Sequence, residues 1–71
     1  MRKTVWVAVD RATGDFVLRH ARYGALARGP ATAVKFIYNN IDWRKRWNEE
    51  KLRSQIYKLV NTWQSRSTTA R

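Results

Sequence analysis

The sequence predicts one small domain of the α+β class, in which an N-terminal β-hairpin packs against two C-terminal helices. Three observations carry this prediction: an alternating apolar pattern near the N-terminus, and two stretches of helical apolar spacing at 31–41 and 48–64. A two-stranded hairpin alone is only marginally stable in water, so helices covering one face are the economical arrangement. We expect the domain to span residues 1–64, followed by a flexible polar tail at 65–71.

The hairpin is predicted from the stretch KTVWVAVDRATGDFVLRHARY. Its valines alternate with other residues, which is the period of two expected of a strand. Asp10 suits the first position of a type I turn, and Gly14 supplies the positive φ that closes it. The second strand is expected to begin at Asp15.

One face of this hairpin is expected to lack a cover. The valines, or Phe16 and Leu18, would meet the helices, which leaves Trp6 and Val17 on the other face. Both strands are sheet edges unless the connector at 24–30, GALARGP, adds a third strand. Surplus apolar surface and an unpaired edge are features that a protein partner uses.

Both helices are predicted from apolar residues at helical spacing. Pro30 is placed to be the first residue of the first helix, and Asn39 and Asn40 are stop signals. The inward face of the first helix consists of Val34, Ile37, Tyr38 and Ile41. That of the last helix consists of Leu52, Ile56, Leu59, Val60 and Trp63.

Charge is the strongest compositional signal. Fifteen Lys and Arg against five Asp and Glu give a net charge of +10 on 71 residues, which draws a chain to polyanions. Cysteine is absent, which fits a reducing, cytoplasmic setting. The apolar run Val5–Val9 is too short to span a membrane, and Asp10 interrupts it too early for a signal peptide. The apolar face of the last helix is needed for the core, so no membrane partner is expected.

No arrangement typical of a catalytic site is present. The five acidic residues include no pair suited to acid–base work, no serine has a glycine elbow, and GALARG lacks the ending of a phosphate loop. His20 alternates in phase with Phe16 and Leu18, which favours a half-buried strand histidine over a catalytic one. We expect no enzyme activity, no metal, no cofactor and no small-molecule ligand.

The stretch 42–50, DWRKRWNEE, allows two interpretations. If the last helix begins at Asn48, that residue is the N-cap, and Trp47 and Leu52 have the spacing of a hydrophobic staple. If the helix runs unbroken from Trp43, then Trp43 and Trp47 face outward among lysines, where they would stack on bases or contact a protein. We favour a mainly structural Trp47 and leave Trp43 open.

Both interpretations place a basic zone around the start of the last helix. It consists of Arg44, Lys45, Arg46, Lys51, Arg53 and Lys58. Such a run is usually a solvated face, but too few anions balance this chain, which favours contact with DNA or RNA. A protein partner would dock on other residues, namely Trp6, Val17, Arg19 and Trp43.

The short, cysteine-free, arginine-rich chain, its hairpin VWVAVDRATGDFVLR and its helix start DWRKRW resemble bacteriophage regulators of host RNA polymerase. The resemblance implies a transcription regulator that binds bacterial RNA polymerase and nearby nucleic acid, inhibiting initiation, promoting antitermination, or both. The residues by themselves leave a second hypothesis, a stand-alone DNA- or RNA-binding protein whose recognition is electrostatic and of low specificity. Both hypotheses describe a binding protein.

Overall fold

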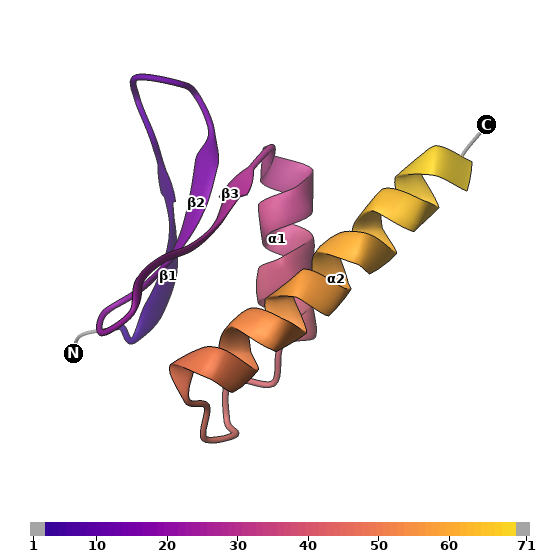
Figure 1. The fold of residues 1–71 in the computed structure, drawn as a ribbon. Coiled ribbons are helices and arrows are strands. Elements are labelled where there is room, and N and C mark those ends of the chain that lie inside the picture. The colour runs from indigo at the N-terminus through magenta and orange to yellow at the C-terminus, as the bar shows by residue number, and fades with distance from the viewer. Residues whose placement is uncertain (1–2, 70–71) are drawn as a thin grey trace.

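A computed structural model describes residues 3–69, and its elements confirm the predicted α+β class. They are β1 (Val5–Val9), β2 (Phe16–His20), β3 (Gly24–Gly29), α1 (Ala31–Asn40) and α2 (Glu49–Thr69). The strands form one antiparallel sheet in the order β1-β2-β3. Figure 1 shows both helices on one side of this sheet, with α1 next to the strands and α2 crossing α1.

The hairpin and its turn are confirmed. The amide of Gly14 donates to the carbonyl of Asp10 at 2.7 Å, and Asp10 Oδ1 accepts from the amide of Ala12 at 3.0 Å. Gly14 has a φ of +79°, a conformation that side chains other than glycine rarely adopt. Strand β2 begins one residue later than expected, at Phe16.

The connector forms the third strand that the sequence left open. Strand β3 pairs antiparallel with β2, and the ladder is irregular between Leu18 and Arg19. Gly24, with a φ of +74°, permits the turn into this strand. Strand β2 is therefore central, and β1 and β3 are the edges of the sheet.

The core lies between the sheet and the two helices. Leu18 from β2, Val34 from α1 and Leu52 from α2 expose 0%, 1% and 0% of their surface. The complete buried cluster consists of Val5, Leu18, Leu26, Val34, Ile37, Ile41, Leu52 and Ile56. The inward faces predicted for both helices are the ones that pack, except that Trp63 is half-buried and lies outside this cluster. Each large aliphatic side chain that is buried contributes about 1.5–3 kcal/mol.

Two helix boundaries differ from the sequence prediction. Pro30 has a ψ of 156° and stands at the N-cap, so α1 begins at Ala31 rather than at the proline. Helix α2 continues through Thr69, so the segment expected as a polar tail is helical over 65–69. No glycine or proline follows Gln64, and each added residue extends an existing helix without a new nucleus. The last two positions of the expected tail, 70 and 71, lie outside the described residues.

Candidate nucleic-acid interface

The segment between the two helices positions the candidate site, and α2 starts where the first interpretation placed it. Asn48 Oδ1 accepts a hydrogen bond from the amide of Lys51 at 2.8 Å, and the carbonyl of Asn48 accepts one from the amide of Leu52 at 3.0 Å. Glu49 and Glu50 occupy the first turn, where the helix dipole favours anions. A helix running unbroken from Trp43 is wrong, because this cap satisfies the first amides of α2 instead.

Both tryptophans of this segment are half-buried and held in a fixed orientation. The Nε1 group of Trp43 donates to the carbonyl of Tyr38 at 2.8 Å, and that of Trp47 donates to the carbonyl of Asp42 at 2.9 Å. The centroids of the Tyr38 and Trp43 rings lie 5.8 Å apart. Trp43 and Trp47 both pack against the buried cluster. Trp47 directly precedes the N-cap, and its spacing from Leu52 along the sequence is that of a hydrophobic staple.

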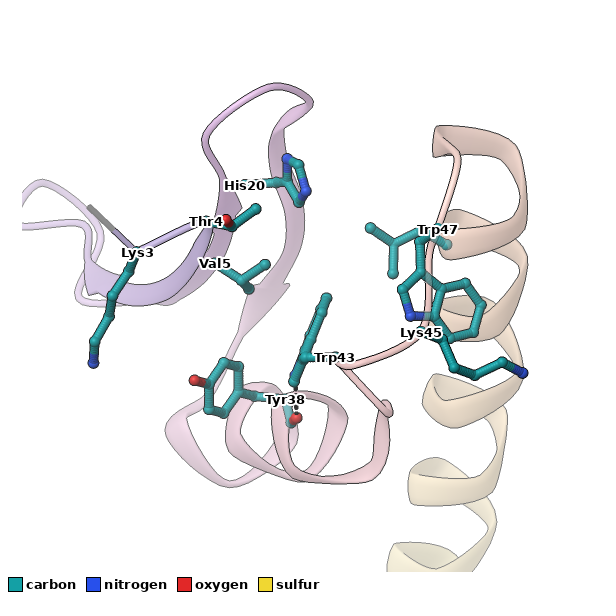
Figure 2. A pocket seen from close by; sticks show the side chains of 9 residues that line it. Lys3, Thr4, Val5, His20, Tyr38, Trp43, Lys45 and Trp47 are labelled. Atoms are coloured by element: carbon teal, nitrogen blue, oxygen red, sulfur yellow. Dashed lines mark hydrogen bonds between the residues drawn. The ribbon is translucent and has the colours of Figure 1, made fainter. Parts of the chain in front are cut away.

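These rings line a pocket of about 450 Å³ between the sheet and the segment that joins the helices. Figure 2 shows Val5 and His20 on the sheet side, Trp47 on the opposite side, the Trp43 ring between them, and Tyr38 at one end. The complete lining is Lys3, Thr4, Val5, His20, Tyr38, Trp43, Lys45, Trp47 and Leu52. Aromatic rings form much of this lining, and we call the site the aromatic pocket. The lining includes no acidic side chain, so the charged groups around the pocket, those of Lys3 and Lys45, are cationic.

His20, at the end of β2, lines this pocket as a neutral side chain. Its Nδ1 accepts hydrogen bonds from the amides of Arg22 at 3.0 Å and Tyr23 at 3.3 Å, and its ring stacks on Tyr23 with centroids 4.4 Å apart. Burial, and then the charge of Arg22, lowers the pKa of His20 below its ordinary value of 6.5. Because Nδ1 is an acceptor, the hydrogen of the neutral ring is on Nε2. The predicted half-buried strand histidine is confirmed.

Three of the six predicted nucleic-acid contacts share one groove along α2. This groove has a volume of about 440 Å³ and is lined by Lys45, Trp47, Glu50, Lys51, Ser54, Gln55 and Lys58. Lys51 and Lys58 stand two helical turns apart on the same side of α2. Lys45 and Trp47 also line the aromatic pocket, so the groove and the pocket adjoin. The ammonium group of Lys45 lies 5.3 Å from the centroid of the Trp47 ring.

The arginines of the predicted basic zone differ from the lysines. Arg53 forms an ion pair with Glu49 at 2.9 Å and donates to the carbonyl of Tyr23 at 3.3 Å, so it attaches α2 to the turn before β3. Arg44 pairs with Asp42 at 3.1 Å while 93% of its side chain stays exposed. This hydrogen bond lowers the pKa of Asp42 below its usual value. Arg46 is exposed and makes no ion pair within residues 3–69.

The residues predicted to contact a protein partner do not form one surface. Trp6 and Arg19 are cross-strand neighbours on the outer face of the sheet, half-buried and exposed respectively. Val17 exposes only 3% of its surface, because it lies on the central strand between β1 and β3 and its neighbours cover it. Trp43 packs against the inner cluster instead. The outer face therefore offers Trp6 and Arg19, and little of Val17.

Sequence reasoning missed the residues that complete the pocket from the sheet and α1 and from the segment before β1, namely Lys3, Thr4, His20 and Tyr38. No local signal identifies them, because they meet the tryptophans only when the sheet packs beside the segment that joins the helices. The apolar periodicity places His20 and Tyr38 on the packed faces of a strand and a helix, and in the structure both are half-buried at the edge of the core.

No protein-family model, curated protein or solved structure matches this chain. Within residues 3–69, neither helix combines the length and apolar character that a membrane crossing requires. The same part of the chain contains no group of three or more His, Cys, Asp or Glu side chains that could hold a metal ion.

Proposed function

We propose that this protein binds nucleic acid through the lysine groove on α2. The observation that carries the proposal is the shared groove of Lys45, Lys51 and Lys58, with Trp47 in its wall and the aromatic pocket beside it. The groove contains one carboxylate, Glu50, against three ammonium groups. A phosphate backbone laid along it would release condensed counterions, which is the main source of affinity in electrostatic nucleic-acid binding.

Recognition in this groove follows the phosphate backbone rather than the base sequence. Lysine is a compact cation on a flexible stem, which positions a strand but reads no sequence directly. The net charge of +10 raises the rate of encounter with any polyanion. The proposed role is binding, and no step of it needs a catalytic group or a cofactor.

The test is the salt dependence of affinity for a short labelled oligonucleotide, measured by fluorescence anisotropy. Each phosphate neutralised contributes about 0.7–0.9 to the slope of log affinity against log salt. We expect the triple variant Lys45→Gln/Lys51→Gln/Lys58→Gln to lower the slope by about 2–3.

The matched control is Arg11→Gln/Arg19→Gln/Lys35→Gln, which removes the same charge from exposed residues that do not line the groove. We expect this control to change the slope less than the groove variant does. Equal changes in both variants would exclude the groove as the contact, and a flat salt profile for the unmodified protein would exclude the function.

The edge of the sheet favours a second candidate, a regulator that docks on bacterial RNA polymerase while it holds nucleic acid. Strand β1 is an edge, Val9 exposes 55% of its surface, and Trp6 lies half-buried beside Arg19 on the outer face. An edge strand with apolar neighbours is a surface to which another protein can add a strand. RNA polymerase is the partner that the sequence resemblance suggests, with inhibition of initiation or antitermination in the bacterial cytoplasm as the result.

This second candidate is tested with purified bacterial RNA polymerase and nuclease-treated protein. We expect binding to persist without nucleic acid, to weaken in Trp6→Ala/Arg19→Ala, and to persist in the triple lysine variant. Because the two variants affect opposite sides of the molecule, they separate docking from nucleic-acid contact. Polymerase binding that disappears with nuclease leaves the stand-alone nucleic-acid binder.

A further inference from the structure

We infer that the aromatic pocket receives the base of one unpaired nucleotide, so that the protein prefers single-stranded to double-stranded nucleic acid. The inference rests on the proposed function, because the lysine groove would hold the neighbouring phosphates. It adds a defined site, a ligand class and a preference between strand states. The base is common to DNA and RNA, so the inference applies to both.

The walls of the pocket are aromatic rings that are already in place. Hydrogen bonds from Nε1 to main-chain carbonyls, 2.8 Å long for Trp43 and 2.9 Å for Trp47, fix both indoles before any ligand arrives. Packing of both rings against the core holds them further. A base that enters would therefore stack without first ordering its binding site, which is the condition under which stacking contributes most to affinity.

The volume and the charges suit a base attached to a strand. A volume of about 450 Å³ lies within the range of pockets that hold small organic groups. Figure 2 shows Lys3 and Lys45 on opposite sides of the pocket, each with its ammonium group directed away from the centre. The phosphates before and after an inserted base would lie toward these two lysines. Beyond Lys45 the strand would continue into the groove toward Lys51 and Lys58.

The polar groups of the lining are those that a base edge needs. Thr4, Tyr38 and His20 are lining residues, and within residues 3–69 the two hydroxyls and the Nε2 group of His20 make no hydrogen bond to another protein group. The hydroxyls can donate or accept, and the neutral His20 ring donates from Nε2. Base edges carry both donors and acceptors, so these groups can be satisfied by a base, whereas an aliphatic side chain would leave them unpaired.

A duplex would bind less well because its bases are stacked and paired inside the helix. Extruding one base from a duplex costs a few kcal/mol, whereas an unpaired strand has largely avoided this cost. The lysine groove alone would not distinguish the two forms so sharply, since both carry phosphates. Strand preference is therefore the property that separates a base in the pocket from phosphates in the groove.

The deciding experiment compares an intact thymidine strand with a fully abasic strand of the same length, at moderate salt, using the unmodified protein. Both strands carry the same phosphates, but only the first carries bases. One base stacked on aromatic rings predicts tighter binding of the intact strand by a factor of roughly 5–150. Quenching of tryptophan fluorescence should accompany the intact strand alone.

Three results of this comparison are distinct. Tighter binding and quenching by the intact strand support the inference. Equal, salt-dependent affinity for both strands overturns the inference and leaves the proposed function standing. If neither strand binds at moderate salt, the proposed function fails and the inference fails with it.

A pair of variants locates the effect on the protein. Trp43→Leu/Trp47→Leu should bring the ratio of intact to abasic affinity close to one. Tyr57→Leu is the control, because Tyr57 is 70% exposed on α2 and does not line the pocket. If the ratio of intact-strand to abasic-strand affinity falls to one in Tyr57→Leu but is unchanged in the tryptophan variant, the base binds elsewhere and the inference is overturned. Should the tryptophan variant fail to fold, the comparison of strands still decides.

Discussion

The buried core and the aromatic pocket both contain large apolar side chains, but these side chains are held in different ways. Leu18, Val34 and Leu52 expose at most 1% of their surface and are held by packing alone. Trp43 and Trp47 remain half-buried, and each is tied by Nε1 to a main-chain carbonyl. Aliphatic side chains close on one another, whereas indoles fixed to the chain keep an open cavity beside the core.

This difference shows where a small domain can place a binding site. A chain of 71 residues has a thin core, and large rings at its margin exceed what the core can cover. Hydrogen bonds from both indoles satisfy their polar groups at the margin, so the half-buried rings are stable without full burial. Stability thus comes from the closed region, and the surface available to a ligand comes from the open one.

The largest effect is expected from a change in the closed region. Leu18→Ala should lower the free energy of unfolding by about 2–5 kcal/mol, because it leaves a cavity in the central strand. A domain of this size has only about 3–5 kcal/mol to lose, so much of the variant should be unfolded at room temperature. Urea unfolding followed by circular dichroism measures the change.

The control for this variant is Val9→Ala, since Val9 exposes 55% of its surface. It should stay within about 0.5 kcal/mol of the unmodified protein. Similar losses in the two variants would contradict the position of the core between β2 and the helices.

A smaller effect is expected where the pocket joins α2. Asn48→Ala removes the Oδ1 acceptor that caps the amide of Lys51, 2.8 Å away, and should cost about 1 kcal/mol. Because Trp47 precedes this cap, the loss should also weaken binding of an unpaired strand. Asn48→Ser retains a capping oxygen and should behave as the unmodified protein does in thermal unfolding. An unchanged melting temperature in Asn48→Ala would show that the cap is not needed.

The smallest expected effect is the pH dependence of stability that arises from His20, on the sheet side of the pocket. Because the pKa of folded His20 is lowered below 6.5, the unfolded chain binds more protons than the folded protein does as pH falls through that value. Stability should therefore decrease as pH falls through 6.5 and level off below the folded pKa. The carboxyls of Asp10 and Asp42, whose pKa values are also lowered, lose their contribution only in more acidic solution.

The variant that isolates this effect is His20→Asn. Asparagine keeps an oxygen that can accept from the amides of Arg22 and Tyr23, but it does not titrate. Melting temperatures measured from about pH 7 to pH 5 should therefore vary less in the variant than in the unmodified protein. Parallel profiles for the two proteins would assign the pH dependence to other groups.

Local patterns in the sequence determined much of the fold. The alternation along β1, the Asp10 and Gly14 turn, and the apolar stripe of α2 each depend on residues close together in the chain. The Asn48 cap was one of two open alternatives, and its short-range hydrogen bond to Lys51 decided between them. Such features are predictable because period and capping chemistry act within one or two turns.

Tertiary structure alone decided the rest. The glycine- and alanine-rich segment 24–29 has weak strand propensity and becomes β3 because β2 supplies its hydrogen-bond partners. Arg53, predicted as part of the basic zone, instead donates a hydrogen bond to the carbonyl of Tyr23, thirty positions earlier in the chain. The pocket exists only because Val5 and His20 from the sheet meet Trp43 and Trp47. These outcomes depend on contacts between distant segments, and sequence periodicity carries no information about which segments will meet.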